Sequence, residues 1–325
     1  MTQIQACARA IAVALPAFLA ATAAHAQSPA EFFKGKTISL QVGFGPGGEN
    51  DAWARLISRH YGNHIPGNPT IVVQHLPGSG GLLVANRLYN TSPKDGTAVG
   101  MINRAIPFEP LLGGQGTQFD ALKFIYIGSP GLDTTVCAAR KDAPVQNLQD
   151  LYTKELTVGG TGSGADTAIY PQFLSALLGM KFKLVQGYKG SGQIQLAMER
   201  KEVDGICVAY DSLLRGNLAR KGQINILLQA GLEPDLRIKN VPQALQAVRS
   251  QEDRRALELF FARVAMGRPL VLPPDVPADR VKAIRDAFQA MLKDKTFLEE
   301  AKKLRLRVIA TTGERMAAVV ADAYK

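Results

Sequence analysis

Two glycine-rich loops hold the residues that could bind a charged ligand. The first, GFGPGG at positions 43–48, follows the apolar stretch Ile38–Val42 and fits the pattern G-x-G-x-x-G. Because glycine lacks a Cβ atom, a ligand can approach the main chain of Gly47 and Gly48 closely. A helix is expected over Glu49–Tyr61, and the positive end of its dipole attracts anions. The first loop therefore predicts a site for an anion.

The same glycine pattern occurs in dinucleotide-binding enzymes, but this chain lacks the rest of that motif. Such enzymes place an acidic residue about 20 residues further on, at the end of the second strand, where it holds the ribose hydroxyls. The corresponding stretch, Thr70–His75, ends in Gln74-His75 and has no carboxylate. We therefore expect no nucleotide cofactor. Asn50 and Asp51, in the first turn of the helix, could instead cap the helix or contact the ligand.

A second loop repeats this arrangement in the middle of the chain. The stretch at 157–174 (TVGGTGSGADTAIYPQFL) predicts a strand, a glycine-rich loop and a helix, in that order. Thr161 and Ser163 add hydroxyl groups to the loop. If the two loops belong to different lobes, they would face each other across a cleft and clamp a small anion between them.

Short β-rich runs alternate with helix-length segments along the chain, which is typical of α/β folds with mainly parallel sheets. The clearest helix is expected over Asp279–Leu292, where apolar residues recur every three or four positions. The expected strands are Thr37–Phe44, Thr70–His75, Thr97–Ile102, Phe124–Gly128, Thr134–Ala139, Leu156–Gly159, Lys183–Gln186, Val203–Ala209, Ile224–Gln229 and Arg263–Leu270.

Two turn-rich stretches, 128–133 and 268–277, indicate crossings between two lobes. Lobe 1 is then discontinuous and comprises residues 27–131 and 268–325, while lobe 2 comprises residues 132–267. A chain that crosses twice forms a hinge, and a cleft lies between the lobes.

The first 26 residues predict a signal peptide for export. The apolar run Ala10–Ala24 is too short to span a bilayer, and Ala24-His25-Ala26 fits the small-x-small pattern that signal peptidase cuts. We expect cleavage after Ala26 and a periplasmic mature protein that is not embedded in a membrane.

The rest of the sequence offers few candidates for catalysis, metal binding or nucleic-acid binding. The net charge is +10 at pH 7, but lysines and arginines are scattered, so nucleic acid is not an expected partner. No nucleophile–base pair is recognisable, and His60 and His64 lack a third ligand, so we expect neither an enzyme nor a metal site. Cys137 and Cys207 could form a disulfide or pack as buried thiols.

Several motifs, in their order along the chain, resemble those of the Bug family, the extracytoplasmic solute receptors of tripartite tricarboxylate transporters. FGPGGENDAWAR at 44–55 is similar to the family's F-x-P-G-G-x-x-D-x-x-A-R, and VVQHLPGSGG at 72–81 is similar to its V-V-x-N-x-P-G-A-G-G. SPKDGTAVG at 92–100 and GYKGSGQIQLAMERKEVD at 187–204 extend the match, which runs from about Phe33 to the C-terminus.

The resemblance implies a type II periplasmic binding protein fold, with two α/β lobes, a central ligand cleft and two crossover hinge strands. It also implies that both loops bind a small organic carboxylate. The residues carried over by position are Phe44, Gly47, Gly48, Asn50 and Asp51 in the first loop, and Thr161, Gly162, Ser163 and Ala165 in the second.

Some positions depart from the family pattern. Ala165 and Ala168 replace the Ser and His of the family's second loop, which leaves fewer polar side chains near the cleft. Arg104 could offset a ligand charge or be an exposed arginine. Tyr210 could line an aromatic pocket or pack in the core.

We therefore expect an exported receptor, a monomer without cofactors or catalytic residues. It would capture a small organic carboxylate between its lobes and deliver it to the membrane subunits of a tripartite tricarboxylate-type transporter. The alternative is that the same fold serves as a ligand-sensing partner of a membrane sensor kinase.

Overall fold

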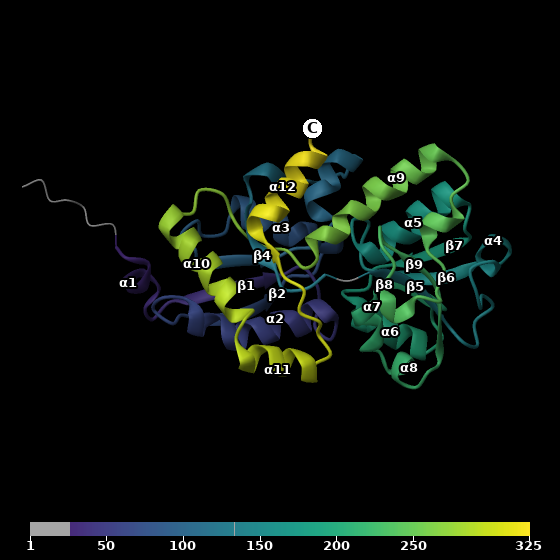
Figure 1. The fold of residues 1–325 in the computed structure, drawn as a ribbon, viewed down its shortest axis with the longest axis horizontal. Coiled ribbons are helices and arrows are strands. Elements are labelled where there is room, and N and C mark those ends of the chain that lie inside the picture. The colour runs from purple at the N-terminus through teal and green to yellow at the C-terminus, as the bar shows by residue number, and fades with distance from the viewer. Residues whose placement is uncertain (1–26, 133) are drawn as a thin grey trace, which may run out of the picture.

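The protein folds around two β-sheets that lie side by side, each covered by helices (Figure 1). The computed structural model describes residues 27–132 and 134–325, so the predicted signal peptide lies outside the described residues. The strands of the first sheet, in the order β11-β4-β10-β3-β1-β2, are β1 (Thr37–Val42), β2 (Thr70–His75), β3 (Ala98–Met101), β4 (Ile125–Ser129), β10 (Leu270–Leu272) and β11 (Thr311–Thr312). The helices that accompany this sheet are α1 (Pro29–Phe33), α2 (Glu49–His60), α3 (Leu82–Asn90), α10 (Ala278–Met291), α11 (Lys295–Lys303) and α12 (Gly313–Ala323).

The second sheet is built from one continuous stretch in the middle of the chain. Its strands, in the order β7-β6-β8-β5-β9, are β5 (Thr135–Arg140), β6 (Leu156–Gly160), β7 (Phe182–Gln186), β8 (Gly205–Ala209) and β9 (Ile224–Ala230). Its helices are α4 (Asp150–Thr153), α5 (Asp166–Leu178), α6 (Ser191–Glu199), α7 (Tyr210–Leu214), α8 (Asn217–Arg220) and α9 (Gln251–Ala262).

The chain passes between the sheets twice, from β4 to β5 and from α9 back to β10. β5 runs antiparallel to β8 and β9, and β10 runs antiparallel to β3 and β4. The expectation of mainly parallel sheets is therefore wrong. Both sheets are mixed, because the strand that follows each crossing, and in the first sheet also β11, runs opposite to the neighbours with which it pairs. From this division of strands we propose residues 27–131 with 268–325 as lobe 1 and residues 132–267 as lobe 2.

The sequence locates most strands well, with ends shifted by at most two residues. The exception is Arg263–Leu270, where residues 263–266 form a 3-10 turn and the strand begins only at Leu270. Gly267 interrupts this run at φ +57°, and a Cβ atom there would lie 2.2 Å from the carbonyl oxygen of Gly131. The two crossings thus pack directly against each other, and the close contact requires glycine.

Burial along the strands follows their place in each sheet. The inner strands β5 and β8 are buried at every position, whereas the edge strand β2 exposes every second residue and no residue of the edge strand β7 is fully buried. In lobe 1, apolar side chains of α2, α10 and α11 pack in one core cluster, and those of α3 and α12 pack in another. The predicted helix over Asp279–Leu292 corresponds to α10, and its Ile284, Phe288 and Met291 are buried.

A disulfide joins Cys137 and Cys207, which lie opposite each other on β5 and β8. Both cysteines are fully buried, so the bond lies inside the core of lobe 2. The structure therefore decides between the two alternatives that the sequence left open. No helix in the described part of the chain has the length and apolar character needed to span a bilayer.

Candidate functional site

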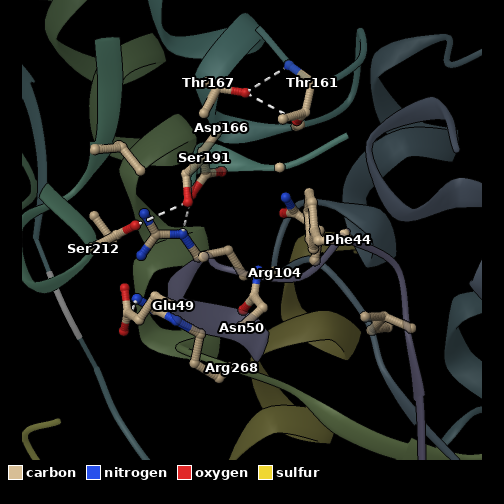
Figure 2. Close-up of a pocket in the computed structure, with 18 of the residues that line it drawn as sticks. Phe44, Glu49, Asn50, Arg104, Thr161, Asp166, Thr167, Ser191, Ser212 and Arg268 are labelled. Carbon is tan, nitrogen blue, oxygen red and sulfur yellow. Dashed lines mark hydrogen bonds and ion pairs between the residues drawn. The ribbon is translucent and has the colours of Figure 1, made fainter. Parts of the chain in front are cut away.

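A cavity of about 70 Å³ lies where the two lobes meet, and both glycine-rich loops contribute to its wall (Figure 2). This volume admits several water molecules or a small ligand. The residues that line it are Phe44, Gly45, Gly48, Glu49, Asn50, Ile102, Asn103, Arg104, Thr161, Ala165, Asp166, Thr167, Gly190, Ser191, Val208, Ala209, Ser212, Gly267 and Arg268.

The first loop and the start of α2 form one part of the wall. Phe44, Gly48 and Asn50, three of the residues predicted to bind the ligand, line the cavity. Gly48 is the N-cap of α2, with φ −91° and ψ −178°, and its side-chain-free backbone leaves the helix without a side-chain cap. The first N–H groups of a helix have no partner within it, so α2 brings main-chain donors to the cavity.

Asp51 and Gly47, also predicted, do not line the cavity. Gly47 is exposed, and its N–H donates a hydrogen bond to Asp51 Oδ2 at 2.9 Å. Asp51 Oδ1 lies 2.7 Å from Arg55 Nε and 2.9 Å from His75 Nε2. Asp51 therefore stabilises the conformation of the first loop through these contacts and does not itself line the cavity.

The second loop and the start of α5 form the opposite part of the wall. Thr161 and Ala165 line the cavity, and Thr161 N donates to Thr167 Oγ1 at 3.0 Å. Ser163 is exposed and Gly162 packs on lobe 1, so neither of these predicted residues lines the cavity. A Cβ atom on Gly162 would lie 2.3 Å from the backbone nitrogen of Gly80.

A third segment, residues 189–192 before and at the start of α6, also borders the cavity. Gly190 and Ser191 line it, and the carbonyl oxygen of Lys189 accepts a hydrogen bond from Gly45 N across the lobes at 2.7 Å. A Cβ atom on Gly48 would lie 2.8 Å from Ser191 Oγ. The first loop therefore packs against this third segment, while the second loop packs against Gly80. Sequence reasoning missed the third segment, although it has the same order of strand, glycines and helix.

Two arginines line the cavity, and each is paired with an acidic residue at the first position of a helix (Figure 2). Arg104 Nε lies 2.6 Å from Asp166 Oδ2, and its Nη2 donates to Thr135 Oγ1, so Arg104 bridges lobe 1 to lobe 2. Arg268 Nη2 lies 2.6 Å from Glu49 Oε1 within lobe 1. The alternative of an exposed Arg104 is wrong, because only 3% of this residue is accessible.

Tyr210 lies outside the cavity wall. The guanidinium carbon of Arg237 is 4.7 Å from the centre of its ring, and the ring packs against apolar residues of lobe 2. Of the two roles considered for Tyr210, packing is the one that the structure has.

A buried carboxylate lies behind the second loop. Glu109, in the 3-10 helix Ile106–Leu112, reaches Gly164 across the lobes, and a Cβ atom on Gly164 would lie 2.4 Å from Glu109 Oε1. Burial raises the pKa of Glu109, and the positive charge of Arg263 partly opposes this effect.

No group of His, Cys, Asp and Glu in the described ranges could hold a metal ion. His60 Nε2 lies 2.7 Å from Glu300 Oε2, and His64 Nε2 lies 3.4 Å from Asp294 Oδ2. Both histidines therefore connect α2 and the turn after it to the α11 region of lobe 1.

Residues 62–325 match the family model described as tripartite tricarboxylate transporter family receptor. The chain belongs to this receptor family. A curated relative of this receptor, a UPF0065 protein of Bordetella pertussis, is 26% identical over 300 residues, which cover 86% of this chain and 83% of the relative.

Solved structures of similar proteins confirm the fold of the receptor. MatC from Rhodopseudomonas palustris, with bound malate, is 20% identical and has a TM-score of 0.71, over 89% of this chain and 96% of that one. The periplasmic binding protein BugD is also 20% identical and has a TM-score of 0.69, over 89% of this chain and 94% of that one. These structures confirm the two-lobed periplasmic binding fold, and the match to the receptor family confirms the resemblance to the Bug family.

Proposed function

We propose that the protein is an exported periplasmic receptor that captures a small organic carboxylate between its lobes and delivers it to a tripartite tricarboxylate-type membrane transporter. The observation that carries this proposal is the meeting of three helix N-termini, those of α2, α5 and α6, at one cavity. Helix N-termini present unpaired N–H groups and favour negative charge. Membership of the receptor family and the malate bound to MatC support the same class of ligand.

The geometry suggests how binding would drive closure. α2 belongs to lobe 1, while α5 and α6 belong to lobe 2, so a ligand meets all three helices only when the lobes are together. A ligand with higher affinity for the closed form shifts the population toward it. A dissociation constant of 1 μM corresponds to about −8 kcal/mol, which several main-chain hydrogen bonds and a modest apolar contact could supply. A membrane partner that recognises the closed form then receives the ligand.

Native mass spectrometry of freshly purified protein tests the ligand class directly. We expect a retained small acid that is released on denaturation and recovered chemically unchanged, as a receptor requires. A thermal-shift panel of mono-, di- and tricarboxylates follows, each measured against its uncharged amide. Stabilisation by the amides but by none of the acids would refute the carboxylate proposal, and conversion of a bound acid into a product would refute the receptor role.

A further inference from the structure

Among the residues that the structure describes, two carboxylates in the cavity wall each have one oxygen without a hydrogen-bond partner. Glu49 Oε1 accepts a hydrogen bond from the indole nitrogen of Trp53 at 3.1 Å and pairs with Arg268, while Glu49 Oε2 is buried and accepts none. Asp166 Oδ2 pairs with Arg104, while Asp166 Oδ1 is likewise buried without a partner. The side chain of Glu49 is only 6% exposed. Buried acceptors of this kind normally find a donor, since leaving them unmatched is costly.

The two arginines that line the cavity do not supply a hydrogen-bond donor to either of these oxygens. The ionisable side chains that line the cavity, within the described part of the chain, form two ion pairs, Arg104 with Asp166 and Arg268 with Glu49. Each arginine is therefore already neutralised by an acid of the protein. A ligand carboxylate would rely mainly on the main-chain donors of the helix N-termini.

A second carboxylate on the ligand would meet an unfavourable environment. A carboxylate has no hydrogen to donate, so next to Glu49 Oε2 and Asp166 Oδ1 it would leave both acceptors unmatched. A neutral or positive donor group would instead be attracted by both. Hydrogen bonds to ionised acceptors are also the stronger ones.

This inference rests on the proposed function and narrows its ligand class. We propose that the ligand carries, beside one carboxylate, an O–H or N–H donor group whose hydrogen bonds Glu49 Oε2 and Asp166 Oδ1 accept. The two acids occupy equivalent places, because each is the first residue of a helix that follows a glycine-rich loop. Lobe 1 and lobe 2 thus each contribute one acceptor for the donor group, and both acids line the same cavity.

Isothermal titration calorimetry with matched acids tests the proposal. Propionate, lactate and alanine share a three-carbon skeleton and differ in having no added donor, a hydroxyl or an ammonium group; succinate, malate and aspartate form the corresponding four-carbon series. We expect a member with a donor to bind about tenfold or more tightly than its partner without one, the usual effect of a hydrogen bond to a charged group. The comparison of hydroxy with amino acids identifies the donor.

Equal affinity for the acids with and without a donor would overturn the inference and leave the proposed function intact. If no acid of either series binds, the proposed function fails and the inference fails with it. If alaninamide or lactamide binds but none of the acids does, the carboxylate part of both is overturned.

A variant assigns the preference to the cavity wall. In Glu49→Gln the ratio of the two affinities should fall to within about twofold, whatever change in absolute affinity follows when Arg268 loses its charged partner. Asp166→Asn should act in the same direction and serves if Glu49→Gln does not fold, as judged by circular dichroism. Glu252→Gln is the matched control, because Glu252 is an exposed acid in the first turn of α9. A preference that survives in both cavity variants would overturn the inference, since a merely structural role does not change the ratio of two affinities.

Discussion

The contact between Gly48 and Ser191 predicts a defect that affects closure and spares the fold. A Cβ atom on residue 48 would lie 2.8 Å from Ser191 Oγ, while the next atoms, the backbone nitrogens of Gly192 and Ser191, are 3.8 Å away. The backbone of Gly48, at φ −91° and ψ −178°, accepts alanine without strain. The clash in Gly48→Ala therefore arises only across the cleft, from a single oxygen atom.

The size of the defect depends on the hydrogen bond that Ser191 loses when the methyl group is added. Ser191 can avoid the new methyl group by rotating its hydroxyl, which breaks its 3.1 Å hydrogen bond to Ser212 Oγ. Such a bond contributes about 1 kcal/mol, so the dissociation constant should rise about fivefold. Without ligand, the thermal midpoint should stay at or above that of the wild type, since replacing glycine by alanine reduces the entropy of the unfolded chain.

Calorimetry with the acid that gives the largest thermal shift measures this effect. Ser191→Ala removes the clashing oxygen, so Gly48→Ala should have no further effect in the Ser191→Ala background. This double-mutant cycle isolates the contact across the cleft. If Gly48→Ala binds as tightly as the wild type, or if it weakens binding equally in the Ser191→Ala background, the two lobes do not close in the way described.

Three further predictions concern the core, the buried acid and a natural probe. Replacing Cys137 and Cys207 together by alanine should lower the free energy of unfolding by about 4 kcal/mol in a urea titration, because the disulfide closes a loop across a sequence separation of 70; an unchanged midpoint would mean that the bond does not form. Burial raises the pKa of Glu109 from 4.5, so the folded state loses stability as the pH rises from 4.5 through the raised value. Glu109→Gln should therefore raise the thermal midpoint at pH 7 and leave it unchanged below pH 4.5, and a uniform shift at both would contradict this cause. Trp53, the only tryptophan of the chain, donates to Glu49 and lies against Gly131 at the first crossing, so its fluorescence should change on ligand binding; a signal insensitive to every bound acid would show that neither place moves.

The sequence could predict elements that depend on local pattern. The strand Thr70–His75 could be predicted because burial alternates along it, and such alternation is visible in the local sequence. Helix α2 begins at Glu49, as predicted, because glycines precede it and polar residues fill its first turn. Phe44 and Thr161 line the cavity because a loop that follows a strand in an α/β sheet lies at the sheet's carboxyl edge, where ligands bind.

The remaining site residues depend on contacts between segments that are far apart in the chain. Arg104 is buried because Asp166, 62 positions away, and Thr135 pair with it across the lobes. Arg268 joins Glu49 only after the chain has returned from lobe 2. The local sequence around one residue does not indicate such a pair, and a single arginine in a loop is usually predicted to be exposed. The segment at Ser191 could have been predicted as part of the site, because its glycines lie between a strand and a helix, as they do in the two loops.

The place of β10 in the first sheet has a consequence for the order in which the molecule matures. β10 lies between β4 and β3, so this sheet stays divided until residue 272 is present, whereas the strands of the second sheet are all complete by residue 230. A chain that emerges with its N-terminus first, from a ribosome or through a membrane pore, can therefore finish the inserted lobe before the lobe that begins it. Until residue 272 is available, the N-terminal part of the chain exposes an incomplete sheet edge, and chaperones would be needed most during this interval.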